Sequence, residues 1–80
     1  MTRQPRTFAA LGFSSTHDAM DAEQLLTDLG ITVVPIPAPK SIGTLCGIAM
    51  RIELSDEERA TGYLSAAGII VNARVEIEDV

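Results

Sequence analysis

The sequence has few of the residues that carry redox or metal chemistry. It contains one cysteine, one histidine and no tryptophan among 80 residues. One cysteine cannot form an internal disulfide, and one cysteine with one histidine cannot complete a four-ligand zinc site within the chain. We therefore expect a protein of a reducing compartment, the cytoplasm, with no metal and no other cofactor.

Positive charge and aromatic side chains are also scarce. Six Lys and Arg residues stand against eleven Asp and Glu residues, which gives a net charge of −5, and the aromatics are two Phe and one Tyr. A negative chain without a basic run or aromatic stacking platform disfavours binding to nucleic acids and anionic membranes. The apolar stretch 8–13 is too short for a signal-peptide core, and no longer run could span a bilayer. We expect neither nucleic acid nor membrane among its partners.

The residues that are present follow the same order twice. The predicted order is strand 7–13, helix 17–29 and strand 31–36, then strand 47–54, helix 56–67 and strand 69–77. Each helix follows a serine that precedes an acidic residue by three positions, Ser15 or Ser55, which is typical of an N-cap. Each helix also ends at a Gly-Ile pair, where Gly30 or Gly68 can take the left-handed conformation.

This order predicts an α+β, ferredoxin-like β-α-β-β-α-β sandwich, with an antiparallel or mixed four-stranded sheet and two helices on one face. Its first and third strands are central, which leaves Pro35 and Pro37 on an edge strand where proline is tolerated. We expect residues 1–80 to form one domain, with residues 1–6 as a flexible tail. Period-two alternation places Ile69, Val71, Ala73, Val75 and Ile77 on one face of the last strand, and we expect that face to be the one covered by the helices.

The linker 37–46 between the halves is too long for a hairpin turn, and we interpret it as a functional loop. It ends at Cys46. Two interpretations of this residue stay open. Cys46 shares its parity with Ile48, so it could be a buried core residue. Alternatively it is a thiolate at the end of the sheet, with its pKa lowered by Lys40 or loop N–H groups and with Gly47 giving a partner access to the sulfur.

His17 is the other residue suited to chemistry, and it could form a dyad with Cys46. We take the two central strands to run parallel, which places His17, after the first strand, and Cys46, before the third, at opposite ends of the sheet. Six residues of strand would separate them by roughly 20 Å. We therefore interpret His17 as a first-turn helix residue.

Several segments together resemble a known family. Residues 15–19, the pair 30–31, the segment 35–40 and the segment 46–51 resemble the selenium/sulfur carrier-like family of small bacterial domains, formerly a domain of unknown function. The typical loop of that family has Thr, Arg and several Ser residues where this chain has Ala38, Lys40 and the segment 43–45. These departures leave the Cys-Gly pair in place.

The resemblance implies that Cys46 holds sulfur or selenium, as a persulfide or selenosulfide, between a donor and an acceptor protein. The chain would then be a stoichiometric carrier rather than a turnover enzyme, with Lys40, Thr44 and Gly47 as supporting residues. The alternative is a small ligand-binding or protein-interaction module with a structural cysteine. In that case the edge strand 31–36 and exposed residues such as Ile70 would form an interface, for example that of a homodimer.

Overall fold

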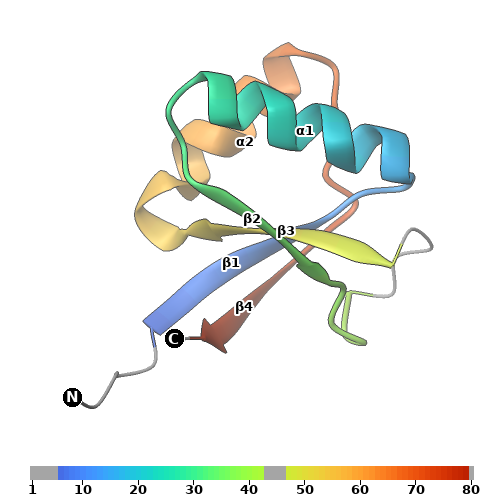
Figure 1. The fold of residues 1–80 in the computed structure, drawn as a ribbon, viewed down its shortest axis with the longest axis vertical. Coiled ribbons are helices and arrows are strands. Elements are labelled where there is room, and N and C mark those ends of the chain that lie inside the picture. The colour runs from blue at the N-terminus through green and yellow to red at the C-terminus, as the bar shows by residue number, and fades with distance from the viewer. Residues whose placement is uncertain (1–5, 43–46, 80) are drawn as a thin grey trace.

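The computed structural model describes residues 6–42 and 47–79. The strands are β1 (Arg6–Gly12), β2 (Val33–Pro37), β3 (Ile48–Glu53) and β4 (Ala73–Asp79). The helices are α1 (Thr16–Asp28) and α2 (Glu57–Ala66), and a 3-10 turn, η1 (Leu54–Asp56), leads into α2. Figure 1 shows both helices on one face of the sheet. Of the expected tail 1–6, Arg6 already belongs to β1, and residues 1–5 lie outside the described residues.

The sheet has the predicted ferredoxin-like topology. Its strand order is β2-β3-β1-β4, and all three neighbouring pairs are antiparallel. The β-α-β-β-α-β order and the central place of the first and third strands are therefore confirmed. Pro35 and Pro37 lie in β2, which is an edge strand. An edge position suits them because proline has no backbone N–H and cannot donate the hydrogen bonds that a central strand needs on both sides.

The two predicted N-caps have different outcomes. The Ser15 hydroxyl accepts a hydrogen bond from the Asp18 backbone N–H at 3.1 Å, so the predicted cap of the first helix is confirmed. The predicted Ser55 cap is wrong. Ser55 lies inside η1, and α2 begins after Asp56, whose side chain makes no capping bond. The 3-10 turn brings the chain from β3 into the helix without a serine cap.

The helix C-termini confirm the predicted glycine stops. Gly30 and Gly68 have φ values of +83° and +77°. After α1, the Ile31 N–H donates to the Leu26 carbonyl at 2.9 Å and the Gly30 N–H donates to the Thr27 carbonyl at 3.0 Å. The same pair of bonds closes α2. Both helices thus end in a Schellman motif, which requires a left-handed residue after the last turn.

The main core lies between the helices and the sheet. Its buried residues are Ala9, Leu11, Phe13, Ala19, Ala22, Leu26, Ile31, Met50, Ile52, Ala60 and Leu64. The helices contribute Ala19, Ala22, Leu26, Ala60 and Leu64 to this core, whereas Leu29 and Ala67 are exposed because each follows the last helical residue. The core is aliphatic apart from Phe13, as the small number of aromatics requires.

A second apolar cluster lies on the opposite, helix-free face of the sheet. Ala10, Ile42 and Ala49 are buried there, and Ile36, Ala38, Ala73, Val75 and Ile77 pack around them. The expectation that the last strand turns its apolar side to the helices is wrong for β4. Residues 69–72 are not strand, so Ile69 and Val71 pack into the main core whereas Val75 and Ile77 face the other way.

Candidate functional site

Three chain segments come together at one end of the sheet. The end of β1 lies beside the start of β3, because the two strands are antiparallel and Gly12 is the register partner of Ala49. The helix α1 begins at the same end, since it follows β1 after a short connection. The expectation that these central strands run parallel is wrong. The segment that carries His17 and the segment that follows Cys46 therefore lie at the same end of the sheet, not at opposite ends.

The linker is closed at its base by backbone hydrogen bonds. The Ala38 N–H donates to the Gly47 carbonyl at 2.9 Å, which extends the pairing of β2 and β3 by one step. Within the linker the Ile42 N–H donates to the Pro39 carbonyl at 3.0 Å, which folds residues 40–42 into a turn. In Figure 1 this turn, drawn in green, projects beneath the sheet on the side without helices.

Gly47 connects the linker to β3. It is exposed and has a φ of +74°, and a Cβ built on it would meet no atom of residues 6–42 and 47–79 within 4 Å, its chain neighbours aside. This conformation favours glycine, so a larger residue would strain the backbone at the entry to β3. Cys46 and Thr44 lie outside the described residues.

Lys40 is exposed in the linker turn and, among residues 6–42 and 47–79, forms no ion pair. Arg51, the nearest basic residue along β3, is already engaged. Its guanidinium donates to Asp79 at 2.6 Å and lies 4.2 Å from the centroid of the Phe8 ring.

His17 lies in the first turn of α1, as predicted, although the helix begins one residue earlier, at Thr16; its side chain is 84% exposed. Its Nε2 atom lies 3.2 Å from a carboxylate oxygen of Asp21, one helical turn along. Such a pair on a helix surface contributes little to stability. The imidazole is thus placed as a surface helix residue.

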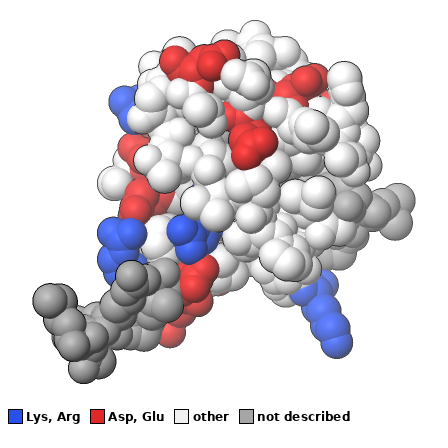
Figure 2. Space-filling model, in the orientation of Figure 1, with Lys and Arg blue, Asp and Glu red and all other residues white. Residues whose placement is uncertain are grey.

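The charges are distributed unevenly over the surface. Figure 2 shows carboxylates over the helical layer and at the end of the sheet where β1 begins, whereas the lower right, where Figure 1 draws the linker turn, is free of acidic colour in this view. The helix α1 alone contains four acidic residues, Asp18, Asp21, Glu23 and Asp28. In this view the linker turn therefore lies outside the acidic surface of the helical layer.

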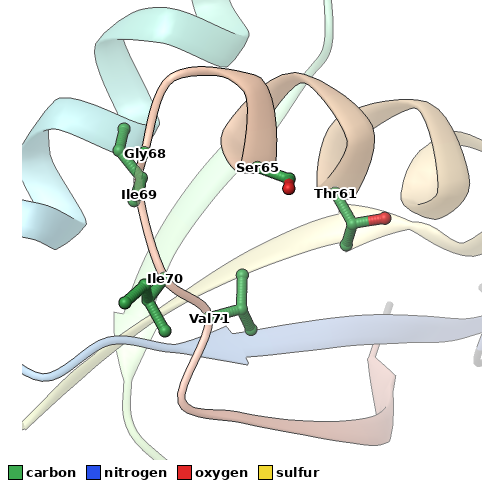
Figure 3. Close-up of a pocket in the computed structure, with 6 residues that line it drawn as sticks. All are labelled: Thr61, Ser65, Gly68, Ile69, Ile70 and Val71. Atoms are coloured by element: carbon green, nitrogen blue, oxygen red, sulfur yellow. The ribbon is translucent and has the colours of Figure 1, made fainter.

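One apolar groove lies beside the second helix, with a volume of about 450 Å³. It runs between α2 and the segment leading to β4, and Figure 3 shows Thr61 and Ser65 on the helix and Ile70 and Val71 on the segment. None of the described residues that line it is titratable. Ile70, which the sequence singled out as an interface residue, is 69% exposed.

The described part of the chain contains neither a cluster of metal ligands nor a membrane helix. No three His, Cys, Asp or Glu residues within 6–42 and 47–79 are grouped so that they could hold a metal ion. No helix among these residues is sufficiently long and apolar to cross a membrane.

A comparison with protein families shows which family the chain belongs to. A family described as "Putative Se/S carrier protein-like" matches residues 9–76, from β1 into β4 and across the whole linker. The chain belongs to this family. The resemblance of the capping, Gly-Ile and Cys-Gly segments to the Se/S carrier-like family is thereby confirmed. No curated protein and no solved structure matches the chain.

The sequence reasoning missed two residues at this end of the Se/S carrier-like fold, Gly12 and Ile42. A Cβ on Gly12 would lie 2.5 Å from the Cγ2 atom of Ile42, so the linker side chain occupies the space that glycine leaves open. A glycine inside a predicted strand often marks a close approach of another segment. Gly12 in the predicted strand 7–13 was such a signal, but a glycine does not indicate which other segment of the chain packs against it.

Proposed function

We propose that this protein carries sulfur or selenium on Cys46. The observation that carries the proposal is the family match over residues 9–76, which includes the Cys46-Gly47 pair. The linker 37–46 is then the functional loop of the domain, and the chain acts as a stoichiometric carrier between a donor and an acceptor protein.

The transfer needs no external oxidant or reductant. The Cys46 thiolate attacks the outer sulfur of a persulfide on the donor, and a new S–S bond forms on Cys46 as the S–S bond of the donor breaks. The donor cysteine leaves as a thiolate, and the outer sulfur keeps its proton. Delivery to the acceptor repeats the same exchange in the opposite sense, and selenium follows the same course as a selenosulfide.

The described part of the linker supports this chemistry in two ways. Gly47 leaves the backbone beside the cysteine uncovered, so a partner can approach closely. Lys40 lies in the same loop, is exposed, and forms no ion pair with any other described residue; a positive charge close to a thiol lowers its pKa. Both features are expected of a loop that presents a thiolate to another protein.

The test is the intact mass of the folded protein after incubation with a small-molecule persulfide donor. We expect a gain of one sulfur atom's mass that a reductant removes, and no gain in Cys46→Ser. A gain that appears only after denaturation would contradict the proposal, because it would identify Cys46 as a buried structural residue. Lys40→Gln should slow the gain without abolishing it.

A second function is favoured by the exposure of Ile70 beside the apolar groove. In this function the domain is an interaction module, and Cys46→Ser leaves its assembly intact whereas Ile70→Glu abolishes it. Size-exclusion chromatography with light scattering across a dilution series separates the two functions. A monomer at every concentration would contradict homodimer formation through this surface.

A further inference from the structure

The two edges of the sheet differ in their ability to accept another strand. On β2, the Ala38 N–H donates to the Gly47 carbonyl, and the alternation of an antiparallel ladder then places the Pro35 and Pro37 nitrogens on the outer side. Proline has no backbone N–H, so this edge cannot donate a hydrogen bond at either position. The outer edge of β2 is therefore blocked.

The strand β4 forms the other edge and is not blocked in this way. It is the last strand in the order β2-β3-β1-β4, and its seven residues include no proline. No strand within residues 6–42 and 47–79 lies on its outer side. An edge strand of this kind presents a row of backbone N–H and C=O groups to which a further strand can pair.

The side chains of β4 are sorted by type onto the two faces of the sheet. Those on the helix-free face are half-buried members of the second apolar cluster, namely Ala73, Val75 and Ile77. Those on the other face are exposed and charged, namely Arg74, Glu76 and Glu78. A strand that pairs with this edge must therefore match an apolar row on one face and a charged row on the other.

The charged row favours one register for a second copy of β4. In an antiparallel pair, residues directly opposite each other project from the same face, and like charges there are destabilising. A register centred on Val75 places Arg74 opposite the partner's Glu76, and it does so twice. Registers centred on residue 74, 76 or 78 place two like charges on the symmetry axis, and a register centred on Ile77 places Glu76 opposite the partner's Glu78. Among the registers centred on residues 74 to 78, only the one at Val75 avoids like charges.

We propose that two copies of this chain pair antiparallel through β4, in the register centred on Val75, and join their two four-stranded sheets into one. Such an interface is isologous, because the same strand is used by both copies. Val75 then lies opposite the partner's Val75 and Ala73 opposite the partner's Ile77, so the apolar cluster of the helix-free face continues from one copy to the next. The pairing does not involve Cys46 and does not depend on the carrier function.

Arg74 is already oriented for this contact. Its Nε and Nη2 atoms donate to Glu57 of α2 at 2.5 and 2.6 Å, and its Nη1 atom donates to Glu76 of its own strand at 2.9 Å. Each Nη atom of a guanidinium carries two N–H groups, so a bond from Nη1 to the partner's Glu76 requires no existing bond to break.

The two linkers lie far apart in such a pair. Each β4 begins at the linker end of its own chain, since Ala73 is the register partner of Gly12. The antiparallel arrangement turns the partner around, so its linker lies at the opposite end of the joined sheet. Each copy therefore keeps a separate linker end that the other copy does not cover.

The test uses two charge reversals that should associate only with each other. Arg74→Glu places two carboxylates opposite each other twice in its own dimer, and Glu76→Arg places two guanidiniums opposite each other twice. Each variant alone should dimerise about tenfold more weakly than the natural chain, or more weakly still. An equal mixture restores both opposite-charge pairs and should recover the dimer. Sedimentation velocity across a dilution series measures the association, and circular dichroism shows that each variant is folded.

The matched control is Glu78→Arg. It makes the same charge change as Glu76→Arg at an exposed position of the same face, but its opposite residue in the proposed register is the partner's Asn72, which lies outside β4. Glu78→Arg should therefore weaken the dimer far less than Glu76→Arg does. Equal losses in these two variants would contradict the register.

Cross-linking tests the register without a change of charge and also answers the question if Arg74→Glu fails to fold. Val75→Cys in a Cys46→Ser background brings the two new cysteines opposite each other, with Cα atoms about 4.5–5.5 Å apart, which is within the range of a disulfide. Mild oxidation should then give a covalent dimer. Ala73→Cys in the same background should not, because its opposite residue is the partner's Ile77.

Two results would overturn the inference. One is a natural chain that stays monomeric at every concentration of the dilution series. The other is a dimer that neither charge reversal weakens and that Val75→Cys does not cross-link, which would mean that the copies associate through another surface, such as the one around Ile70. A chain that accepts sulfur as a monomer leaves the carrier function in place and shows the pairing through β4 to be wrong.

Discussion

The two serines that precede the helices offer a sharp test of the structure, because they are alike in sequence and different in geometry. Ser15 accepts a hydrogen bond from the Asp18 N–H at 3.1 Å, and the extended backbone of Ser15 is that of an N-cap. Ser55 lies within a 3-10 turn, one residue before the Asp56 cap. Replacement of each serine by alanine should therefore have unequal consequences.

Ser15→Ala removes the acceptor of a first-turn N–H in a partly buried position. The loss of a serine N-cap costs about 1 kcal/mol, within a range of about 0.5–2. For a domain of this size that corresponds to a fall in the melting temperature of about 4–8 °C. Ser55→Ala removes no capping bond, and we expect a change within about 0.5 kcal/mol, as for an ordinary surface substitution.

The assay is urea unfolding followed by far-ultraviolet circular dichroism, with the natural chain and both variants measured side by side. Ser15→Asp serves as a rescue variant, because aspartate accepts the same N–H and favours the helix dipole. Equal losses in Ser15→Ala and Ser55→Ala would refute the reasoning, since they would mean that α2 begins at a serine cap as α1 does.

Three other predictions follow from the fold. Gly68→Ala should destabilise the domain by about 1 kcal/mol, because its φ of +77° disfavours a Cβ, whereas Gly62→Ala inside α2 should stabilise it by up to about 1 kcal/mol in the same unfolding assay. Leu64→Ala, at a fully buried site, should cost about 2–5 kcal/mol, and a loss under about 1 kcal/mol would contradict the main core. The Arg74 side chain donates hydrogen bonds to Glu57 at 2.5 and 2.6 Å and lowers the pKa of that carboxyl below its ordinary 4.5. Since the unfolded chain binds the proton more readily, the stability from this pair is complete above about pH 4.5 and is lost as the pH falls through the folded pKa. Glu57→Gln should flatten the stability profile in that acidic range, and an unchanged slope would count against the pair.

The repeat in the sequence predicted the fold because local signals and the hydrophobic pattern agree. Ser15, Gly30 and Gly68 act through hydrogen bonds and backbone angles within a few residues, so their effects can be inferred from neighbours in the chain. The predicted Ser55 cap was wrong because the same short sequence can form either an N-cap or a 3-10 turn. The path of the chain out of β3 determines which of the two forms, and that path is not visible in the neighbouring residues.

The faces of the sheet were harder to predict from the sequence than its order. Ile69 and Val71 share one parity with Val75, yet parity holds only while the chain stays extended, and residues 69–72 interrupt it. The antiparallel pairing of β1 with β3 is part of the predicted ferredoxin-like order, in which β1 and β2 run in the same direction and β3 lies between them in the opposite one. The expected parallel pairing of the central strands contradicted that order. The contact of Ile42 with Gly12 joins residues thirty positions apart and depends on tertiary packing alone.

The pairing of the two outer ends of the chain has a practical consequence. Arg6 is the register partner of Asp79, so β1 begins and β4 ends side by side (Figure 1), at the end of the sheet away from the linker. A tether added before β1 or after β4 therefore leaves the linker end facing outward. The protein can be immobilised through a tether on either side as bait in a search for the partners that the proposed carrier function requires, and two versions tethered on opposite sides should capture the same ones.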